Sequence, residues 1–330
     1  MTELGWCGGF MIRTRESQLI FDPSSTGNQL QDSSIFISHA HADHSTGLRS
    51  KFLKYSSPET RKIFENLSGR SVVNFHDTNF GRPIKFGDVE VNPINAGHML
   101  GSTQFLVTLP DTTILYTGDI NYIDTLTTKG AEKVECDILV TEATYGDPSY
   151  VFPDREGIYA NIVKWTLEQI SKGLVPTFQV YAAGKAQELV RLFNLYTNLD
   201  VITTQKIAKV NAVYSDSGLN LNCSEAASEV NNNSCVCITT RSNSMNTKNY
   251  AQAVTTGWAL NMHSSRAGAF PLSSHADFNQ LLQFVKDSGA KTVYGFTGCT
   301  EVFANQIRRK LGISSRPLPH FAQKTLQCFS

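Results

Sequence analysis

The sequence predicts a mixed α/β protein, because of its length and of two patterns that divide the chain. With 330 residues, of which 41% are hydrophobic and 18% charged, the chain can bury a substantial core. Its first part contains short apolar segments with the composition of strands, and after Tyr145 segments with helical spacing alternate with strand-like ones. This composition excludes a disordered chain and a fibrous repeat.

Six segments in the first part of the chain have the composition of β-strands. Each is rich in Ile, Val, Leu, Phe and Thr and is bounded by Asp, Gly or Pro, as strands usually are. The predicted strands are residues 18–23, 33–39, 88–96, 103–110, 112–119 and 136–143. We expect tight turns between them.

Helices and strands alternate in the remainder of the chain. Residues 155–173 place their apolar side chains at roughly helical spacing, and Gly173 suits the end of a helix. A strand and a helix that begins near Lys185 follow. The predictions beyond these are surface loops over the Ser- and Asn-rich residues 211–234, a strand at 235–240, a helix at 277–289, a strand at 291–298 and a helix at 301–312.

Charge and hydropathy patterns argue against several classes of function. The 29 Lys and Arg residues balance 29 Asp and Glu residues, so any site for a polyanion must be local. No apolar run approaches the roughly 18 residues of a membrane span. The first ten residues lack the charged region and the apolar core of a signal peptide. We therefore expect an intracellular, cytoplasmic protein with no membrane partner.

The seven cysteines do not form a disulfide framework. Their number is odd and their positions are scattered, which favours reduced thiols. Cys235 and Cys237 form a CxC motif, but no second pair is spaced as in a zinc ribbon. We expect these two residues to be a buried structural pair.

The strongest chemical signal is the segment SHAHADHS, directly after the predicted strand 33–39. It supplies His39, His41, Asp43 and His44, which are four metal-ligand types within six residues. A strand end followed by a loop can direct the first two toward one metal and the last two toward a neighbouring position. The HxHxDH motif therefore predicts a site for one or two metal ions.

This motif resembles the hallmark of the metallo-β-lactamase fold family, and other segments match that family's motif order. Asp22 in IFDP stands where the family has an acidic residue that braces the ligating histidines by hydrogen bonds. His98 in NAGHMLGS matches the third histidine ligand, and Asp119 in LYTGDIN matches the bridging aspartate. The resemblance implies one or two Zn²⁺ ions, with Mn²⁺ or Mg²⁺ as alternatives in the second site.

Within that family the chain resembles the β-CASP nucleases. Glu142 in TEATYG matches an acidic motif of that branch, AAGKAQELV resembles its GRAQE segment, and His275 in PLSSHADF matches a histidine motif. The resemblance implies a four-layered αββα sandwich with an inserted α/β cap, and catalytic roles for Asp119, Glu142 and His275. The implied domains are a first metallo-β-lactamase part (1–148), a β-CASP cap (149–269) and a final metallo-β-lactamase part (270–330).

Two segments are candidates for binding phosphate. Gly184 and Lys185 stand where a strand gives way to a helix, and the free N–H groups of a first helical turn suit an anion. The hydroxyl-rich segment after CVCI carries one positive charge and includes Thr240, Arg241 and Ser242. A solvated loop explains this second segment equally well.

One position departs from the pattern of the RNA-cleaving members. They usually carry a histidine before the glycine that follows the last strand, and here Thr297 precedes Gly298. Threonine is a poor zinc ligand, so the second metal should be weaker, differently ligated or absent. The DNA-acting members, which include Artemis-like and ligase-associated exonucleases, also lack this histidine.

The leading hypothesis is therefore a 5′ exonuclease on single-stranded DNA in repair. The first alternative is an RNA nuclease of 3′-end processing or 5′ trimming, which would use the 2′-hydroxyl in its binding cleft. A second alternative is an inactive scaffold that binds nucleic acid. Aromatic residues that could stack on bases, such as Tyr181 and Trp258, are by default assigned to the core.

Overall fold

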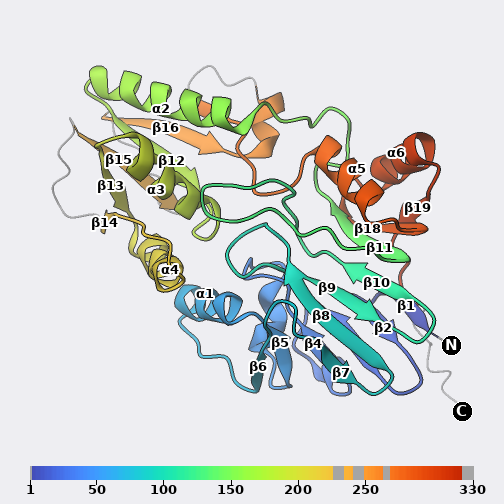
Figure 1. The fold of residues 1–330 in the computed structure, drawn as a ribbon. Coiled ribbons are helices and arrows are strands. Elements are labelled where there is room, and N and C mark those ends of the chain that lie inside the picture. The colour runs from blue at the N-terminus through green and yellow to red at the C-terminus, as the bar shows by residue number, and fades with distance from the viewer. Residues whose placement is uncertain (1, 226–233, 241–248, 263–267, 322–330) are drawn as a thin grey trace, which may run out of the picture.

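The fold was analysed in a computed structural model, which describes residues 2–225, 234–240, 249–262 and 268–321. The described strands form three sheets, of which two pack face to face and the third lies beside them with its own helices (Figure 1). No helix among the described residues is long and apolar enough to cross a membrane.

The first sheet holds six strands in chain order and runs from antiparallel pairing into parallel pairing at its third strand. Its strands are β1 (Glu3–Trp6), β2 (Phe10–Arg13), β3 (Gln18–Phe21), β4 (Ser34–Phe36), β5 (Lys54–Ser56) and β6 (Phe75–Asp77). On one face lie α1 (Pro58–Ser68) and the short helices η1 (Asn28–Leu30) and η2 (Ser45–Arg49), which contribute buried Phe64, Leu30 and Leu48 to an apolar cluster.

The second sheet holds seven strands in the order β19-β18-β11-β10-β9-β8-β7. These are β7 (Ile84–Phe86), β8 (Val89–Asn95), β9 (Thr103–Thr108), β10 (Thr113–Tyr116), β11 (Ile138–Ala143), β18 (Thr292–Gly298) and β19 (Ser314–Pro317). Helices α5 (Phe278–Asp287) and α6 (Thr300–Leu311) bury Phe284 and Phe303 in the cluster on its outer face. The layer order is therefore helix, sheet, sheet, helix, which confirms the predicted αββα sandwich.

Aromatic rings fill the space between the two packed sheets. Phe21 is fully buried and stacks on Phe10 and Phe36, from the neighbouring strands β2 and β4. From the facing sheet, Phe105 and Tyr116 place their ring centroids 5.4 and 5.3 Å from that of Phe21. Because this core is closely packed, it holds the ends of β3, β4 and β10 in fixed positions.

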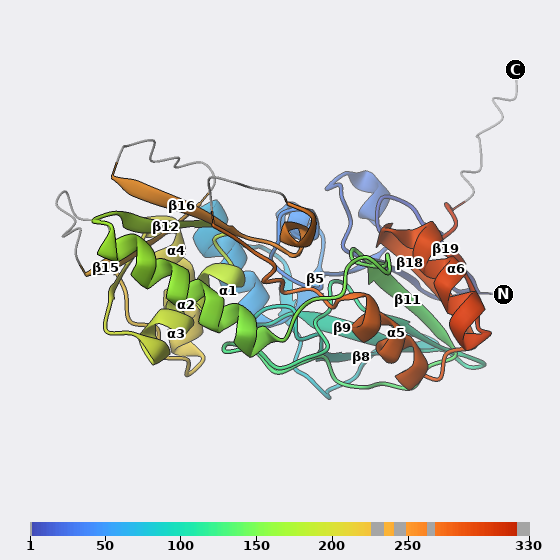
Figure 2. The ribbon, with the colours of Figure 1, turned by 90° about the horizontal axis from the view of Figure 1, so that it is seen from above.

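The third sheet is parallel throughout, in the order β14-β13-β15-β12-β16-β17. Its strands are β12 (Val175–Val180), β13 (Asp200–Thr203), β14 (Ser224–Glu225), β15 (Cys235–Thr240), β16 (Tyr250–Thr255) and β17 (Gly268–Phe270), with η3 (Gly257–Asn261) after β16. It is packed with α2 (Arg155–Ser171), α3 (Lys185–Tyr196) and α4 (Gln205–Asp216), at the opposite end of the molecule from α6 (Figure 2). We call this layer, residues 155–270, the cap; the predicted boundary at 269 falls within β17.

Local sequence explains where the helices that border the site begin. Asp154 caps α2 by accepting a hydrogen bond from the Gly157 amide. Asp277 caps α5 and forms a reciprocal capping box with Gln280. These caps fix the chain directly before and after the two helices.

Two sequence predictions are wrong: the connection between the predicted strands 33–39 and 88–96 is no tight turn but contains α1 and three short strands, and residues 211–234 are not all loop. Their first part, predicted as a surface loop, forms the second half of α4, where Val213 and Tyr214 are buried. The Ser and Asn content of the segment concealed the apolar spacing that begins at Ile207 and Val210. Residues 226–233 of that prediction lie outside the described part of the chain. Cys235 and Cys237 are buried on β15, as expected of a structural pair.

Candidate active site

The HxHxDH segment lies in the loop between β4 and η2, at the carboxyl end of β4. His39 is fully buried, whereas the Asp43 side chain is 79% exposed. His44 directly precedes η2 and occupies its N-cap position. The loop therefore directs side chains from one short segment both into the protein and toward its surface.

His98 and Asp119 come from the facing sheet, each after a strand. His98 follows β8, and Asp119 follows β10. The residue before Asp119 is Gly118, with a φ of +55°, and a Cβ there would lie 2.6 Å from the Cβ of Ser38. Only glycine allows the turn to pass so close to the loop that carries the histidines.

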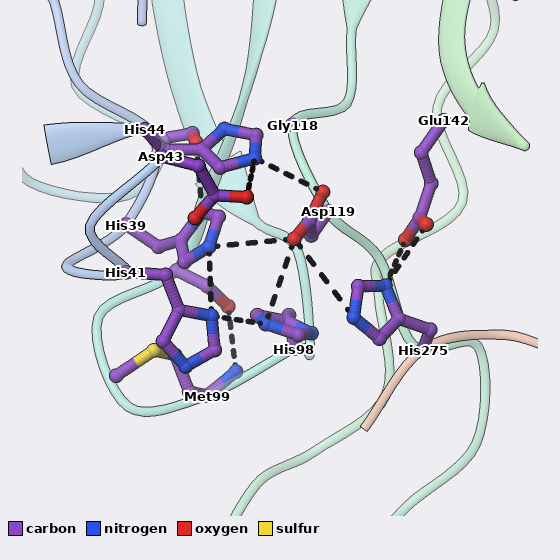
Figure 3. A network of polar contacts seen from close by, with 12 residues as sticks. His39, His41, Asp43, His44, His98, Met99, Gly118, Asp119, Glu142 and His275 are labelled. Atoms are coloured by element: carbon purple, nitrogen blue, oxygen red, sulfur yellow. Dashed lines mark hydrogen bonds and ion pairs between the residues drawn. The ribbon is translucent and has the colours of Figure 1, made fainter. Parts of the chain in front are cut away.

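Three histidines and Asp119 converge on one point (Figure 3). The Nδ1 atom of His41 lies 3.1 Å from the Nε2 atoms of both His39 and His98. The Oδ2 atom of Asp119 lies 3.4 Å from His39 Nε2 and 3.8 Å from His98 Nε2. Three imidazole nitrogens and a carboxylate in this arrangement match the donor set that binds Zn²⁺ in catalytic sites.

The other nitrogen of each ring has an outer partner that fixes which nitrogen faces the centre. His41 Nε2 lies 3.3 Å from the Ala183 carbonyl oxygen, and His98 Nδ1 lies 2.7 Å from the Ser274 carbonyl oxygen. Because a carbonyl only accepts, both outer nitrogens carry the proton and both inner ones present a lone pair. His39 Nδ1 has the Ser38 hydroxyl at 3.0 Å. The residues present therefore fit a divalent metal.

A second group of donors shares Asp119 with the first. His44 Nε2 lies 3.4 Å from Asp119 Oδ1 and 3.8 Å from Asp43 Oδ2. Of the donors expected of a second metal, His44 thus lies near both Asp43 and Asp119. This group is more open than the first, because Asp43 extends into solvent.

Asp22 braces this part of the site from a strained backbone position. Its φ is +49°, and its side chain is buried. Its carboxylate accepts hydrogen bonds from the Ser38 amide and hydroxyl at 2.7 and 2.6 Å, from His44 Nδ1 at 2.7 Å and from the Tyr116 hydroxyl at 2.9 Å. Asp22 therefore has the position predicted for it, behind the histidines.

Glu142 and His275 form a pair on the other side of Asp119. His275 Nδ1 lies 2.9 Å from Glu142 Oε2, and His275 Nε2 lies 4.0 Å from Asp119 Oδ2. Glu142 also accepts hydrogen bonds from the Ile120 amide at 2.7 Å and from the Thr144 hydroxyl. The two residues are 133 positions apart in the chain, and the fold brings them together as the resemblance implies.

Burial and neighbouring charges shift the pKa values of these groups in different directions. Burial lowers the pKa of His41 to about 4, and burial also places the pKa values of His39 and His98 well below the usual range. For His44, burial is outweighed by Asp119 and Asp22, and the pKa is raised to about 10. Burial raises the pKa of Asp119 to about 6.

The pair beside Asp119 is held in its charged form. Burial alone would lower the pKa of His275, but the carboxylates of Glu142 and Asp119 outweigh it and raise the pKa. Burial likewise opposes ionisation of Glu142, yet His275 and the surrounding hydrogen-bond donors lower its pKa. These shifts favour the protonated form of His275, whose Nε2 faces Asp119.

A cavity of about 550 Å³ lies between the packed sheets and the cap, and its lining includes His41, Asp43, His44, His98, Asp119 and His275. Lys185 and Thr297 also line this cavity. Thr240 is the last residue of β15 and is not one of the described residues that line it. Arg241 and Ser242, predicted with Thr240 to bind phosphate, lie outside the described residues. The Cys299 thiol lies 4.0 Å from the Thr144 carbonyl oxygen. It belongs to neither group of close donors among the described residues, which are His39, His41, His98 and Asp119, and Asp119, Glu142 and His275.

Two aromatic residues that the sequence assigned to the core are exposed in this cavity. Tyr181 is 62% exposed and Trp258 is 44% exposed, whereas Tyr145 is buried beneath Trp258 at a ring distance of 4.9 Å. Sequence composition contains no signal that separates exposed aromatic residues from core ones. The carbonyl groups of Ala183 and Ser274, which bind His41 and His98, were also not predicted from the sequence. Any residue type can supply a main-chain carbonyl, so no sequence signal marks it.

Comparisons with known proteins agree with this geometry. Residues 9–170 match the family model described as the beta-lactamase superfamily domain. A probable RNase of Methanocaldococcus jannaschii is 32% identical over 206 residues, covering 52% of this chain and 47% of the relative. A probable DNA ligase of Opitutus terrae is 27% identical over 83% of this chain and 28% of the relative. An endoribonuclease of Neurospora crassa is 32% identical over 43% of this chain and 17% of its own length.

The chain thus spans less than half the length of these curated relatives. A crystal structure of a protein of unknown function from Enterococcus faecalis has the same fold over 97% of this chain and 98% of its own, with a TM-score of 0.65 and 15% identity. The matched domain, the αββα layers and the motif order lead to one conclusion. Residues 9–170 of this chain form a domain of the metallo-β-lactamase superfamily.

Proposed function

We propose that this protein is a metal-dependent nuclease that hydrolyses phosphodiester bonds in RNA. The observation that carries the proposal is the convergence of a metal-donor cluster and a charged His–Glu pair on opposite sides of Asp119. Both groups open into one cavity that is large enough for a nucleotide. The arrangement supports hydrolysis of a phosphate ester better than a purely structural metal site.

His39, His41, His98 and Asp119 would hold a first metal, and Asp43, His44 and Asp119 a second. A divalent ion held there would neutralise the charge of a scissile phosphate and make water acidic enough to attack near neutral pH. We propose Zn²⁺ for the first group, whose donors are three imidazoles. The second group offers two carboxylates and one imidazole, which also suits Mn²⁺ or Mg²⁺.

His275 would protonate the departing oxygen of the cleaved bond. Glu142 fixes the Nδ1–H tautomer at 2.9 Å, so the Nε2–H is the proton that His275 can donate into the cavity. Burial opposes this protonation, but the carboxylates of Glu142 and Asp119 outweigh it and raise the pKa of His275, which favours the protonated donor. After donation, the neighbouring Glu142 carboxylate would favour recovery of a proton from solvent.

The cap wall of the cavity would bind the nucleic acid. The exposed rings of Tyr181 and Trp258 offer surfaces on which nucleobases can stack. Lys185 begins α3, and its ammonium donates to the Thr255 carbonyl oxygen at 3.1 Å at the edge of the cavity. A cation at a helix N-terminus is a suitable neighbour for a phosphate.

We propose RNA rather than DNA as the substrate because two relatives are named as ribonucleases. The Methanocaldococcus protein is named a probable RNase and the Neurospora protein an endoribonuclease. An intracellular location belongs to the same proposal.

DNA is the second candidate, and two observations favour it. The match to the probable DNA ligase covers 83% of this chain, more than the matches to the two RNA-cleaving relatives above. Thr297 also stands where RNA-cleaving members of the family usually have a histidine. A 5′ exonuclease on single-stranded DNA, the leading hypothesis from sequence, is therefore the competing proposal.

The test is digestion of matched 5′-phosphorylated RNA and single-stranded DNA of one sequence, with Zn²⁺ or Mn²⁺, followed on a sequencing gel. The wild type is compared with Asp119→Ala, with His275→Ala and with His76→Ala, which alters an exposed histidine on β6. We expect RNA to be cut by the wild type and by His76→Ala, and by neither site variant.

Each other outcome selects a different function. Stepwise shortening of DNA from its 5′ end, with RNA intact, would replace the RNA proposal with the DNA exonuclease. Binding of either polymer without cleavage, at any metal concentration, would replace both with a nucleic-acid-binding scaffold.

A further inference from the structure

A short segment, residues 273–276, connects the cap to the candidate active site; we call it the junction segment. The Ser274 carbonyl oxygen accepts the Nδ1–H of His98 at 2.7 Å. The next residue is His275, whose ring is bonded to Glu142 at 2.9 Å. One metal-ligand candidate and the proposed proton donor therefore depend on the position of the same few backbone atoms.

The cap contacts this segment through Arg155, the first residue of α2. Its Nη1 donates to the Ser273 carbonyl oxygen at 3.1 Å. Its Nη2 and Nε donate to Glu188 Oε1 on α3 at 2.6 and 3.0 Å. Tyr159 donates its hydroxyl to the same carboxylate oxygen and accepts a bond from Arg155 Nε at 2.8 Å. All three guanidinium nitrogens are thus engaged.

The cluster of Arg155, Tyr159 and Glu188 is buried at a helix N-terminus, and both features oppose a charged arginine there. The side chains of Arg155 and Glu188 are only 12% and 2% exposed, so both charges lose most of their hydration. Arg155 is also a cation at the N-terminus of a 17-residue helix, the end at which the helix dipole favours an anion. The carboxylate and the tyrosine compensate for this arrangement.

The shape of the guanidinium explains what the cluster accomplishes. Glu188 and Tyr159 bind the Nε and Nη2 atoms of the planar Arg155 guanidinium. The remaining nitrogen, Nη1, is thereby directed toward the Ser273 carbonyl oxygen. A lysine ammonium could neutralise Glu188 but could not occupy all three directions at once. The fork therefore transmits the position of α2 and α3 to the backbone of the junction segment.

We propose that Arg155 is a positioning residue that fixes the junction segment, and through it the metal-facing nitrogen of His98 and the direction of His275. Its effect on cleavage rests on the proposed nuclease function. Its effect on metal binding does not, because the contact between Ser274 and His98 is independent of the substrate.

The test compares the wild type with two variants and a control. Arg155→Met combined with Glu188→Met replaces the pair with apolar side chains of similar length and leaves no unpaired charge. Arg155→Lys keeps the charge and loses the fork. Arg191→Met is the control, since this arginine lies on α3, is partly exposed and contacts the Asn220 carbonyl oxygen. Each protein is checked for folding by its melting temperature.

Two readouts follow. The affinity for Co²⁺ is measured by chelator competition and by the visible absorption of the bound ion, without any nucleic acid. Cleavage is then measured as kcat and KM over a range of pH. We expect the double variant and Arg155→Lys to bind the first metal about 10- to 100-fold more weakly. We expect kcat to fall by a similar factor while KM changes less than about threefold, because the cap wall is intact.

The outcomes separate the two proposals. A folded double variant with the metal affinity, cobalt spectrum and kcat of the wild type would overturn the positioning role. If the double variant does not fold, Arg155→Lys decides the same question. If the wild type cleaves neither polymer, the nuclease proposal fails, and the cobalt titration still tests Arg155. Arg191→Met should match the wild type in every measurement.

Discussion

The two walls of the cavity differ sharply in how firmly their side chains are held. On the wall formed by the packed sheets, His98 and Asp119 are 3% and 5% exposed, and the ring of His98 is fixed by a main-chain carbonyl. On the cap wall, Tyr181 and Trp258 are 62% and 44% exposed. The first wall is a preorganised set of donors, and the second is an open surface.

This difference indicates a division of labour. Buried, hydrogen-bonded groups keep their geometry when a reaction develops charge, so they suit chemistry. Exposed rings tolerate different bases and sequences, so they suit binding. Substitutions on the first wall should therefore reduce kcat and metal content, and substitutions on the second should weaken substrate binding alone.

The largest effect is expected at Asp119, because it is shared by both metal groups and faces His275. Asp119→Asn should lower kcat by on the order of 10³-fold or more and should reduce bound metal. Metal content by mass spectrometry and single-turnover cleavage measure both. Asp111→Asn, at an exposed turn, is the matched control. Full metal content with kcat within tenfold of the wild type would contradict the shared role.

Asp22 should have the next largest effect, although it does not reach the cavity. Asn is tolerated at its positive φ, so Asp22→Asn should keep the turn and weaken the bonds to Ser38, His44 and Tyr116. Loss of such an outer partner typically costs about 10- to 100-fold in metal affinity or activity. Chelator competition and kcat are the measurements, and wild-type values for both would show that Asp22 only shapes the turn.

pH should separate the two metal groups. The pKa of His41 is about 4, so at neutral pH a first metal displaces no proton from it. Burial would lower the pKa of His44, but Asp119 and Asp22 raise it to about 10, so a second metal must displace one proton. From pH 7 to 8.5 the affinity for the second metal should rise about tenfold per pH unit, and that for the first should change little. Chelator titrations at several pH values measure both, and equal slopes would refute the assignment.

The sequence was sufficient to predict the residues of the buried wall but not those of the cap wall. His39, His41, Asp43 and His44 are adjacent in the chain and of ligand type, so their chemistry is visible before any fold is known. Strand composition also located six strands of the two packed sheets, since β-branched and apolar runs carry a strong signal, but it missed shorter strands such as β1, β2 and β5. The sequence did not reveal contacts between a side chain and a distant backbone atom, such as that between the His98 ring and the Ser274 carbonyl oxygen, 176 residues away.

The cap wall depends on exposure, which composition does not report. Tyr181 and Tyr145 are the same residue type and both line the cavity, yet the first is 62% exposed and the second 3%. The difference arises because Tyr145 is packed under Trp258, whereas Tyr181 follows the end of β12. The same limit applies to α4, whose buried apolar face was overlooked because the Ser- and Asn-rich segment that follows it dominated the composition of residues 211–234.

The cap wall should respond in binding rather than in chemistry. Tyr181→Ala and Trp258→Ala remove the exposed rings, and each should weaken oligonucleotide binding by about 5- to 100-fold with kcat little changed. Tyr196→Ala is the control, because Tyr196 is 53% exposed but lies on α3, outside this cavity. Fluorescence anisotropy with metal-free protein gives the affinities. A drop in kcat without a change in affinity would contradict the division between the walls.

The smallest effect is expected where the two walls meet, at Thr297. It is exposed near the end of β18 and lines the same cavity as Asp43, His44 and Asp119, and a threonine hydroxyl is a weak metal ligand. Thr297→His would add an imidazole donor and should tighten the second metal about tenfold, with the first metal unchanged. The control is Thr256→His, which places the same ring on the cap wall of the same cavity. If both variants raise the affinity for the second metal equally, the gain is a general effect of an added histidine. The residue at position 297 then does not determine how strongly Asp43, His44 and Asp119 bind a metal.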